Sequence, residues 1–117
     1  MTPPGFMLPA VYEGSTWEGI KLITLIDRQT NLPINLSGAV VDMTYRRVGE
    51  KTQQHSLGIG AGITLVSAED GKLRVPPQIL PLPAGDYYFE LIVQLAAGDK
   101  LPILVGTQEI TRLGVPS

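Results

Sequence analysis

Residues 82–112, which read LPAGDYYFELIVQLAAGDKLPILVGTQEITR, predict the main structural element of this chain. Two long apolar runs flank the turn residues Ala97-Gly98-Asp99, and Pro83-Ala84-Gly85 leads into the first run. Apolar runs rich in aromatic and β-branched residues on either side of a short glycine turn are typical of a β-hairpin. We therefore predict one long hairpin whose first strand buries every second side chain: Tyr87, Phe89, Leu91, Val93 and Leu95.

Two residues of this hairpin carry more specific structural predictions. Tyr87 follows Pro83 by four positions at the entrance to a late strand. A tyrosine in that place is typical of the tyrosine corner of sandwich domains, in which the hydroxyl group bonds backbone just upstream. Gly106 interrupts the return strand, and a glycine inside a strand usually marks a bulge or a bend.

The remainder of the chain also alternates between short apolar runs and turn residues. Residues 17–27 are apolar on both strand faces, which predicts a central strand, whereas residues 39–48 alternate and predict a half-buried strand. Residues 78–82 are expected to form a connection with one helical turn. Further strands are predicted at 7–12, 55–59, 63–66 and 72–75. About eight strands at this spacing are typical of an all-β sandwich or barrel.

The composition excludes several classes of function. The net charge is −2 at pH 7, which disfavours binding to nucleic acid. The chain has no cysteine, so it has neither a disulfide nor a thiolate metal site. The absence of cysteine is consistent with assembly in a reducing cytoplasm. No apolar run is long enough to cross a bilayer, and the first residues do not resemble a signal peptide. Only 17% of the residues are charged, which indicates surface that neighbouring proteins cover.

No group of residues predicts catalysis. His55 is the single histidine, so neither a Ser-His-Asp arrangement nor a histidine metal site is expected. The acidic side chains at Asp42, Asp86, Glu90 and Glu109 have the outward positions that strand alternation explains without chemistry. The run of glycines at 58–62 lacks the Lys-Ser/Thr of a nucleotide loop and predicts an inter-strand loop. The chain is therefore expected to be no enzyme, with no cofactor and no metal.

The large aromatic residues allow two interpretations. A row of exposed rings would form a platform on which sugar rings stack, and the residues available for it are Tyr12, Trp17, Tyr45 and Tyr88. In the other interpretation these rings pack in the core, with their polar atoms at its rim. Trp17 is expected to be structural in that case.

Several short motifs recur in an order that resembles one protein family. They are GSTW at 14–17, LPINLSGA at 32–39, YRR at 45–47, GITL at 62–65, GKL at 71–73, LPAGDYYFEL at 82–91 and GTQEITR at 106–112. In this order they resemble a family of small immunoglobulin-like proteins of tailed bacteriophages and prophages. They resemble the N-terminal domain of phage upper baseplate proteins and related short tail proteins.

The resemblance implies an antiparallel immunoglobulin-like β-sandwich of about 7–8 strands at residues 10–112, between an N-terminal arm (1–9) and a C-terminal tail (113–117). It implies a non-enzymatic structural or adaptor protein of a virion tail, baseplate or fibre attachment, assembled in the host bacterial cytoplasm. Its partners would be other virion proteins, in a homo-oligomer or symmetric assembly, with no nucleic acid and no membrane. The arm is expected to clasp a partner through Phe6, Met7, Leu8 and Tyr12. The alternative function is a carbohydrate-binding module for recognition of the host surface.

Overall fold

The fold was analysed in a computed structural model that describes residues 5–112. The expectations for residues 1–4 and for the tail at 113–117 lie outside the described residues. The described chain is all-β, as predicted, and it contains no helix that could cross a membrane. Its thirteen strands are β1 (Gly5–Met7), β2 (Val11–Tyr12), β3 (Thr16–Trp17), β4 (Ile20–Thr24), β5 (Ile26–Asp27), β6 (Leu32–Pro33), β7 (Val40–Arg47), β8 (Gln53–Ile59), β9 (Gly62–Ser67), β10 (Lys72–Val75), β11 (Gln78–Ile79), β12 (Gly85–Gln94) and β13 (Lys100–Thr111).

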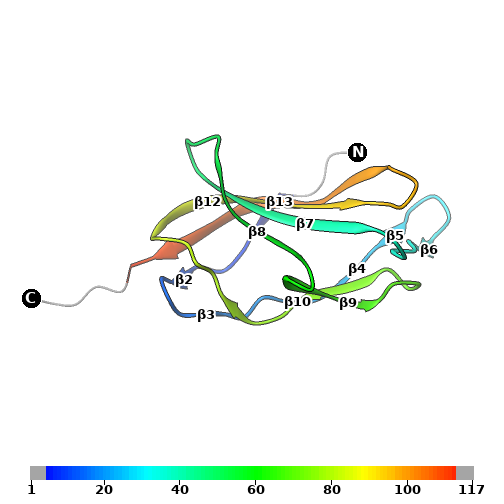
Figure 1. The fold of residues 1–117 in the computed structure, drawn as a ribbon, viewed down its shortest axis with the longest axis horizontal. Coiled ribbons are helices and arrows are strands. Elements are labelled where there is room, and N and C mark those ends of the chain that lie inside the picture. Colours follow the sequence, from blue (N-terminus) through cyan, green and yellow to red (C-terminus); the bar gives the residue numbers. More distant parts are fainter. Residues whose placement is uncertain (1–4, 113–117) are drawn as a thin grey trace, which may run out of the picture.

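Nine of these strands form one mixed sheet that curls into a half-barrel. Eight follow the order β1-β13-β12-β7-β8-β9-β10-β4, and β2 also pairs with β13. In Figure 1, β7, β12 and β13 form the upper layer and β4, β9 and β10 form the lower layer. The predicted pair of separate antiparallel sheets is therefore not what the structure shows. A single sheet supplies both layers, and β1, β2 and β9 each lie parallel to a neighbour.

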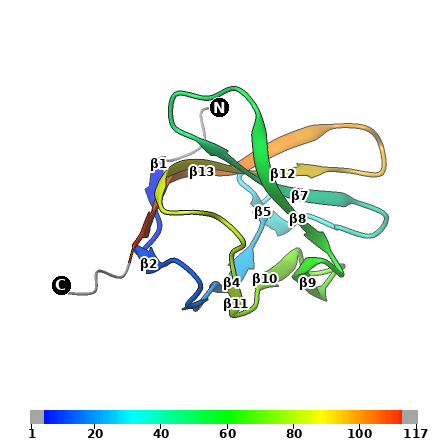
Figure 2. The ribbon, with the colours of Figure 1, turned by 60° about the vertical axis from the view of Figure 1, so that its left-hand side comes forward.

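The glycine-rich segment at residues 58–62 carries the sheet from one layer to the other. Gly60 and Gly62 have positive φ values of 80° and 101°, and β8 and β9 then run parallel with Gly58 opposite Gly62. A Cβ atom at Gly62 would lie 2.6 Å from Leu57 Cδ2, so only glycine fits there without displacement. The predicted inter-strand loop is thus a corner of the sheet, and it explains why the two layers are continuous (Figure 2).

The predicted hairpin is the centre of the upper layer. β12 pairs with β13 on one side and with β7 on the other, and Tyr87, Phe89, Leu91 and Val93 point into the core as predicted. The expected interruption at Gly106 is wrong, because Gly106 pairs in register with Phe89. The register shifts further along, where Leu104 faces Leu91 and Pro102 faces Ile92, so Ile103 is the extra residue. A proline has no amide hydrogen for the ladder, which favours an irregularity at this point.

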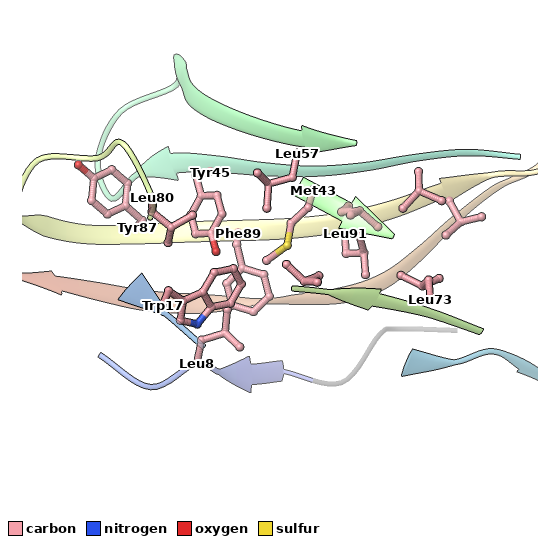
Figure 3. Close-up of a cluster of buried hydrophobic side chains, with 14 of the residues drawn as sticks. Leu8, Trp17, Met43, Tyr45, Leu57, Leu73, Leu80, Tyr87, Phe89 and Leu91 are labelled. Atoms are coloured by element: carbon pink, nitrogen blue, oxygen red, sulfur yellow. The ribbon is translucent and has the colours of Figure 1, made fainter. Parts of the chain in front are cut away.

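The core lies between the two layers of the curled sheet. Figure 3 shows Tyr45, Met43, Phe89 and Leu91 of the upper layer packed toward Trp17, Leu8 and Leu73. Gln108 is the buried polar side chain of the described residues. The Tyr45 hydroxyl donates to Gln108 Oε1 at 2.8 Å, and Gln108 Nε2 donates to the Pro9 carbonyl oxygen at 3.2 Å. The N-terminal segment is therefore fastened to the core by a polar bridge.

Residues 17–27 do not form the predicted central strand. They divide into β3, β4 and β5, and β4 lies at an edge of the sheet, where it pairs with β10. Leu22 on β4 is exposed, and so is Ile26 on β5, which pairs only with β6. The register between β4 and β10 shifts at Lys21 and Leu22, so this edge carries a bulge. Residues 78–82 contain β11, which pairs with β3, in place of the expected helical turn.

Candidate functional site

The outward face of β7, β12 and β13 gathers the polar side chains of the upper layer. Strand pairing places Arg46, Tyr88 and Thr107 in one row across the three strands. The next row contains Thr44, Glu90 and Val105. These side chains alternate with the buried residues of the same strands, so the alternation that builds the core also builds this face. In Figure 1 the reversal between β7 and β8 rises above it.

A hollow of about 460 Å³ lies on this face, and we call it the outer hollow. Lys51 of the reversal between β7 and β8 and Gln53 at the start of β8 contribute to its lining. Its other lining residues come from β7, β12 and β13: Thr44, Tyr45, Arg46, Tyr88, Phe89, Glu90, Val105, Gly106 and Thr107. The volume lies in the range of sites that bind small molecules.

A second hollow, also of about 460 Å³, adjoins the outer hollow. Thr44, Gln53 and Glu90 line both hollows. The second hollow continues toward the other end of β12 and is lined there by Val40, Asp42, Ser56, Ile92, Gln94 and Lys100. The two hollows together make a surface depression that follows the strands.

Two neighbouring arginines of β7 differ in what they bind. Arg47 Nη2 donates to the Ala84 carbonyl oxygen at 2.6 Å, and its guanidinium lies 5.9 Å from the centre of the Tyr87 ring. Arg47 is therefore part of the scaffold around the hairpin entrance. Arg46 is exposed, and its guanidinium carbon lies 5.7 Å from the centre of the Tyr88 ring, at the rim of the outer hollow. A cation and a π face at this distance attract each other weakly.

The predicted tyrosine corner is present. The Tyr87 hydroxyl donates to the Pro83 carbonyl oxygen at 2.7 Å, and the ring is buried. Burial raises the pKa of Tyr87, and nearby Arg47 acts in the opposite direction. This hydrogen bond therefore ties the segment just before β12 to the first residues of that strand.

The residues considered for catalysis do not form one site. Asp42 and Glu90 lie on the outward face of β7 and β12, whereas Asp86 and Glu109 face each other across β12 and β13. His55 lies opposite Tyr45 on β8, with ring centroids 6.5 Å apart, and desolvation lowers its pKa. Residues 5–112 contain no cluster of histidine and acidic side chains that could hold a metal ion. Asp42 and Glu90 both line the second hollow, so two of the four acidic side chains share a surface and the other two lie elsewhere.

The four rings considered for a sugar platform do not lie on one surface. Trp17 and Tyr45 are buried in the core, and Tyr12 and Tyr88 are 51% and 43% exposed. Tyr12 belongs to β2 at the edge of the sheet, and Tyr88 belongs to β12 near its middle. The platform of four rings is therefore not formed, and Tyr88 is the one exposed ring of the four that lines a hollow.

The predicted contact residues of the N-terminal arm have different environments. Gly5–Met7 form β1, which pairs in parallel with Val105–Thr107 of the same chain, and Phe6 lies opposite Gly106. Leu8 is 4% exposed and belongs to the core, so its assignment as a partner contact is wrong. Met7 and Tyr12 are exposed. This stretch pairs with the sheet of its own chain, because the edge of β13 offers backbone N–H and C=O groups nearby.

Sequence reasoning missed the outer hollow. It identified the outward positions of Tyr88 and Glu90, but it placed no other strand beside them. Arg46, Lys51 and Gln53 join them only because β7 pairs with β12 and the β7–β8 reversal stands over the face. Comparison with known proteins adds no assignment, because no family model and no curated protein matches the chain.

Proposed function

We propose that this chain is a non-enzymatic structural or adaptor component of a bacteriophage virion that acts through protein–protein contacts. In this proposal it is a variant of the immunoglobulin-like sandwich in which one curled sheet supplies both layers. The Tyr87–Pro83 hydrogen bond supports the family likeness, because it lies inside the LPAGDYYFEL motif on which the resemblance rests. The virion tail, baseplate or fibre attachment remains the proposed location, with assembly in the host cytoplasm.

One observation carries the proposal of protein–protein contact. Three consecutive strands, the edge strand β4 and the separate pair β5–β6, expose large apolar side chains: Leu22 on β4, Ile26 on β5 and Leu32 on β6. Each is at least half exposed, and the three strands lie together at the right of Figure 1. We call these three residues the apolar end. Large apolar side chains left exposed on neighbouring strands favour a surface that a partner covers.

The edge of the sheet beside the apolar end is protected against strand addition. β4 carries a bulge at Lys21 and Leu22. A bulge and a lysine on an edge strand each hinder pairing with a further strand. The proposed neighbour therefore packs against side chains of the apolar end and does not extend the sheet.

The first experiment is a search for the chain in purified particles. Particles of a phage whose genome encodes this chain are purified from a lysate by density gradient, and their proteins are identified by mass spectrometry. The proposal expects the chain at a fixed ratio to the tail proteins. Particles that lack the chain would overturn the virion assignment.

The second experiment tests the apolar end itself. Leu22→Lys and Leu32→Lys are introduced together, and incorporation into particles is measured with melting temperature as a check on folding. Val40→Lys is the matched control, because Val40 is as exposed as Leu22 (54% and 53%) and lies on the other layer. We expect the double variant to lose incorporation while the control retains it. Equal incorporation of both variants would remove the apolar end from the proposal.

A further inference from the structure

The outer hollow combines an exposed aromatic ring with side chains that bond hydroxyl groups. Tyr88 is 43% exposed and lines the hollow together with Thr44, Gln53, Glu90 and Thr107. A saccharide has an apolar C–H face that can lie on a ring, and a rim of hydroxyl groups that need donors and acceptors. We propose that the outer hollow binds a saccharide that carries a carboxylate group. This goes beyond the proposed virion function and does not depend on it.

The positively charged side chains of the outer hollow favour a ligand that carries a carboxylate group. Arg46 and Lys51 both line the hollow that contains Tyr88, and the Arg46 guanidinium lies over one face of the ring, 5.7 Å from its centre, so the other face is the one open to a sugar. A guanidinium binds a carboxylate through two parallel hydrogen bonds, and a lysine adds a second positive charge. Arg47, one residue further along, is bonded to backbone instead. Glu90 lies in the neighbouring row, where it accepts hydrogen bonds from sugar hydroxyl groups.

The position of the hollow favours a saccharide over an extended peptide. Its floor lies within the sheet, where β12 pairs with a strand on each side, so the backbone groups of the floor are used by the ladders. A peptide that binds in extended form gains its affinity from backbone groups at a sheet edge. A ligand on this floor must be held by side chains, and a polyhydroxyl ligand is suited to that.

The second hollow gives room for more than one sugar unit. It adjoins the outer hollow at Thr44, Gln53 and Glu90 and continues past Asp42 and Ile92 to Gln94 and Lys100, so acidic and basic side chains both line it. The outward residues of β12 from Tyr88 to Gln94 span about 20 Å at about 3.3 Å per residue. An oligosaccharide is therefore expected to bind more tightly than its monomer, because it contacts both hollows.

The test uses the full chain and a matched pair of ligands. Tetragalacturonate is titrated into the chain by calorimetry and by NMR, alongside the same tetramer with its carboxylates methyl-esterified. We expect a Kd at or below about 1 mM for the acid and a value about tenfold weaker for the ester. Tyr88→Ala is expected to weaken both ligands about tenfold, and Arg46→Gln to remove most of the difference between acid and ester. Tyr12→Ala is the control, since it removes an exposed tyrosine outside both hollows.

Three outcomes would overturn the proposal. The first is no binding of either tetramer by the folded chain up to about 10 mM. The second is equal affinity for acid and ester, which would show that the hollow does not recognise the carboxylate group. The third is that polyglutamate of equal charge binds as tightly and is insensitive to Tyr88→Ala, which would identify a general anion patch. None of these outcomes bears on incorporation into particles, so the virion proposal fails or stands separately.

Discussion

At the scale of single residues, the hydroxyl group of Tyr87 has a structural role that can be measured. It donates to the Pro83 carbonyl oxygen at 2.7 Å, and the ring is almost fully buried. Tyr87→Phe removes the bond and keeps the ring, so the free energy of unfolding should fall by about 1 kcal/mol. That corresponds to a melting temperature about 4 °C lower for a domain of this size. Thermal unfolding followed by circular dichroism measures it, with Tyr12→Phe as the exposed control. An unchanged melting temperature would show that the corner contributes nothing.

His55 is the residue whose ionisation should change stability near neutral pH. Desolvation lowers its pKa in the folded chain, so the unfolded chain binds more protons as the pH falls below the ordinary value of about 6.5. Stability from this group is fully present above about pH 6.5 and is lost as the pH falls toward the lowered folded pKa. Urea unfolding at about pH 7.5 and pH 5.5 should show a drop that is smaller in His55→Gln. An equal drop in both chains would assign the pH dependence to other groups.

At the scale of elements, the corner between β8 and β9 depends on glycine for two separate reasons. Gly60 and Gly62 both have positive φ, but space is open around Gly60, whereas a Cβ at Gly62 would lie 2.6 Å from Leu57 Cδ2 and 2.9 Å from Gln78 Oε1. Gly60→Ala should cost about 1 kcal/mol for backbone strain alone. Gly62→Ala should cost about 2–4 kcal/mol, because crowding in the core is added. Denaturant unfolding of the two variants separates the contributions, and equal costs would show that the core absorbs the methyl group.

At the scale of the whole molecule, Gln108 couples β7, β13 and the N-terminal segment. It accepts from the Tyr45 hydroxyl and donates to the Pro9 carbonyl oxygen, and burial raises the pKa of Tyr45. Gln108→Leu leaves the Tyr45 hydroxyl buried without its acceptor, which should cost about 2–3 kcal/mol. Adding Tyr45→Phe removes the stranded hydroxyl and should recover about 1 kcal/mol or more. A double-mutant cycle by urea unfolding measures the coupling. Strict additivity of the two substitutions would contradict the bridge.

The chemistry of local sequence determined the all-β class, the long hairpin at its centre and the tyrosine corner. Strand alternation fixes which face of β12 is buried, and Tyr87 reaches a carbonyl only four residues away, so both depend on neighbours along the chain. Tertiary structure decided four other features. They are the curl of one mixed sheet, the edge position of β4, the bulge at Ile103 and the outer hollow. Arg46, Lys51 and Tyr88 meet because strands distant in sequence pair in one register, and alternation alone specifies a face without specifying which strand lies beside it.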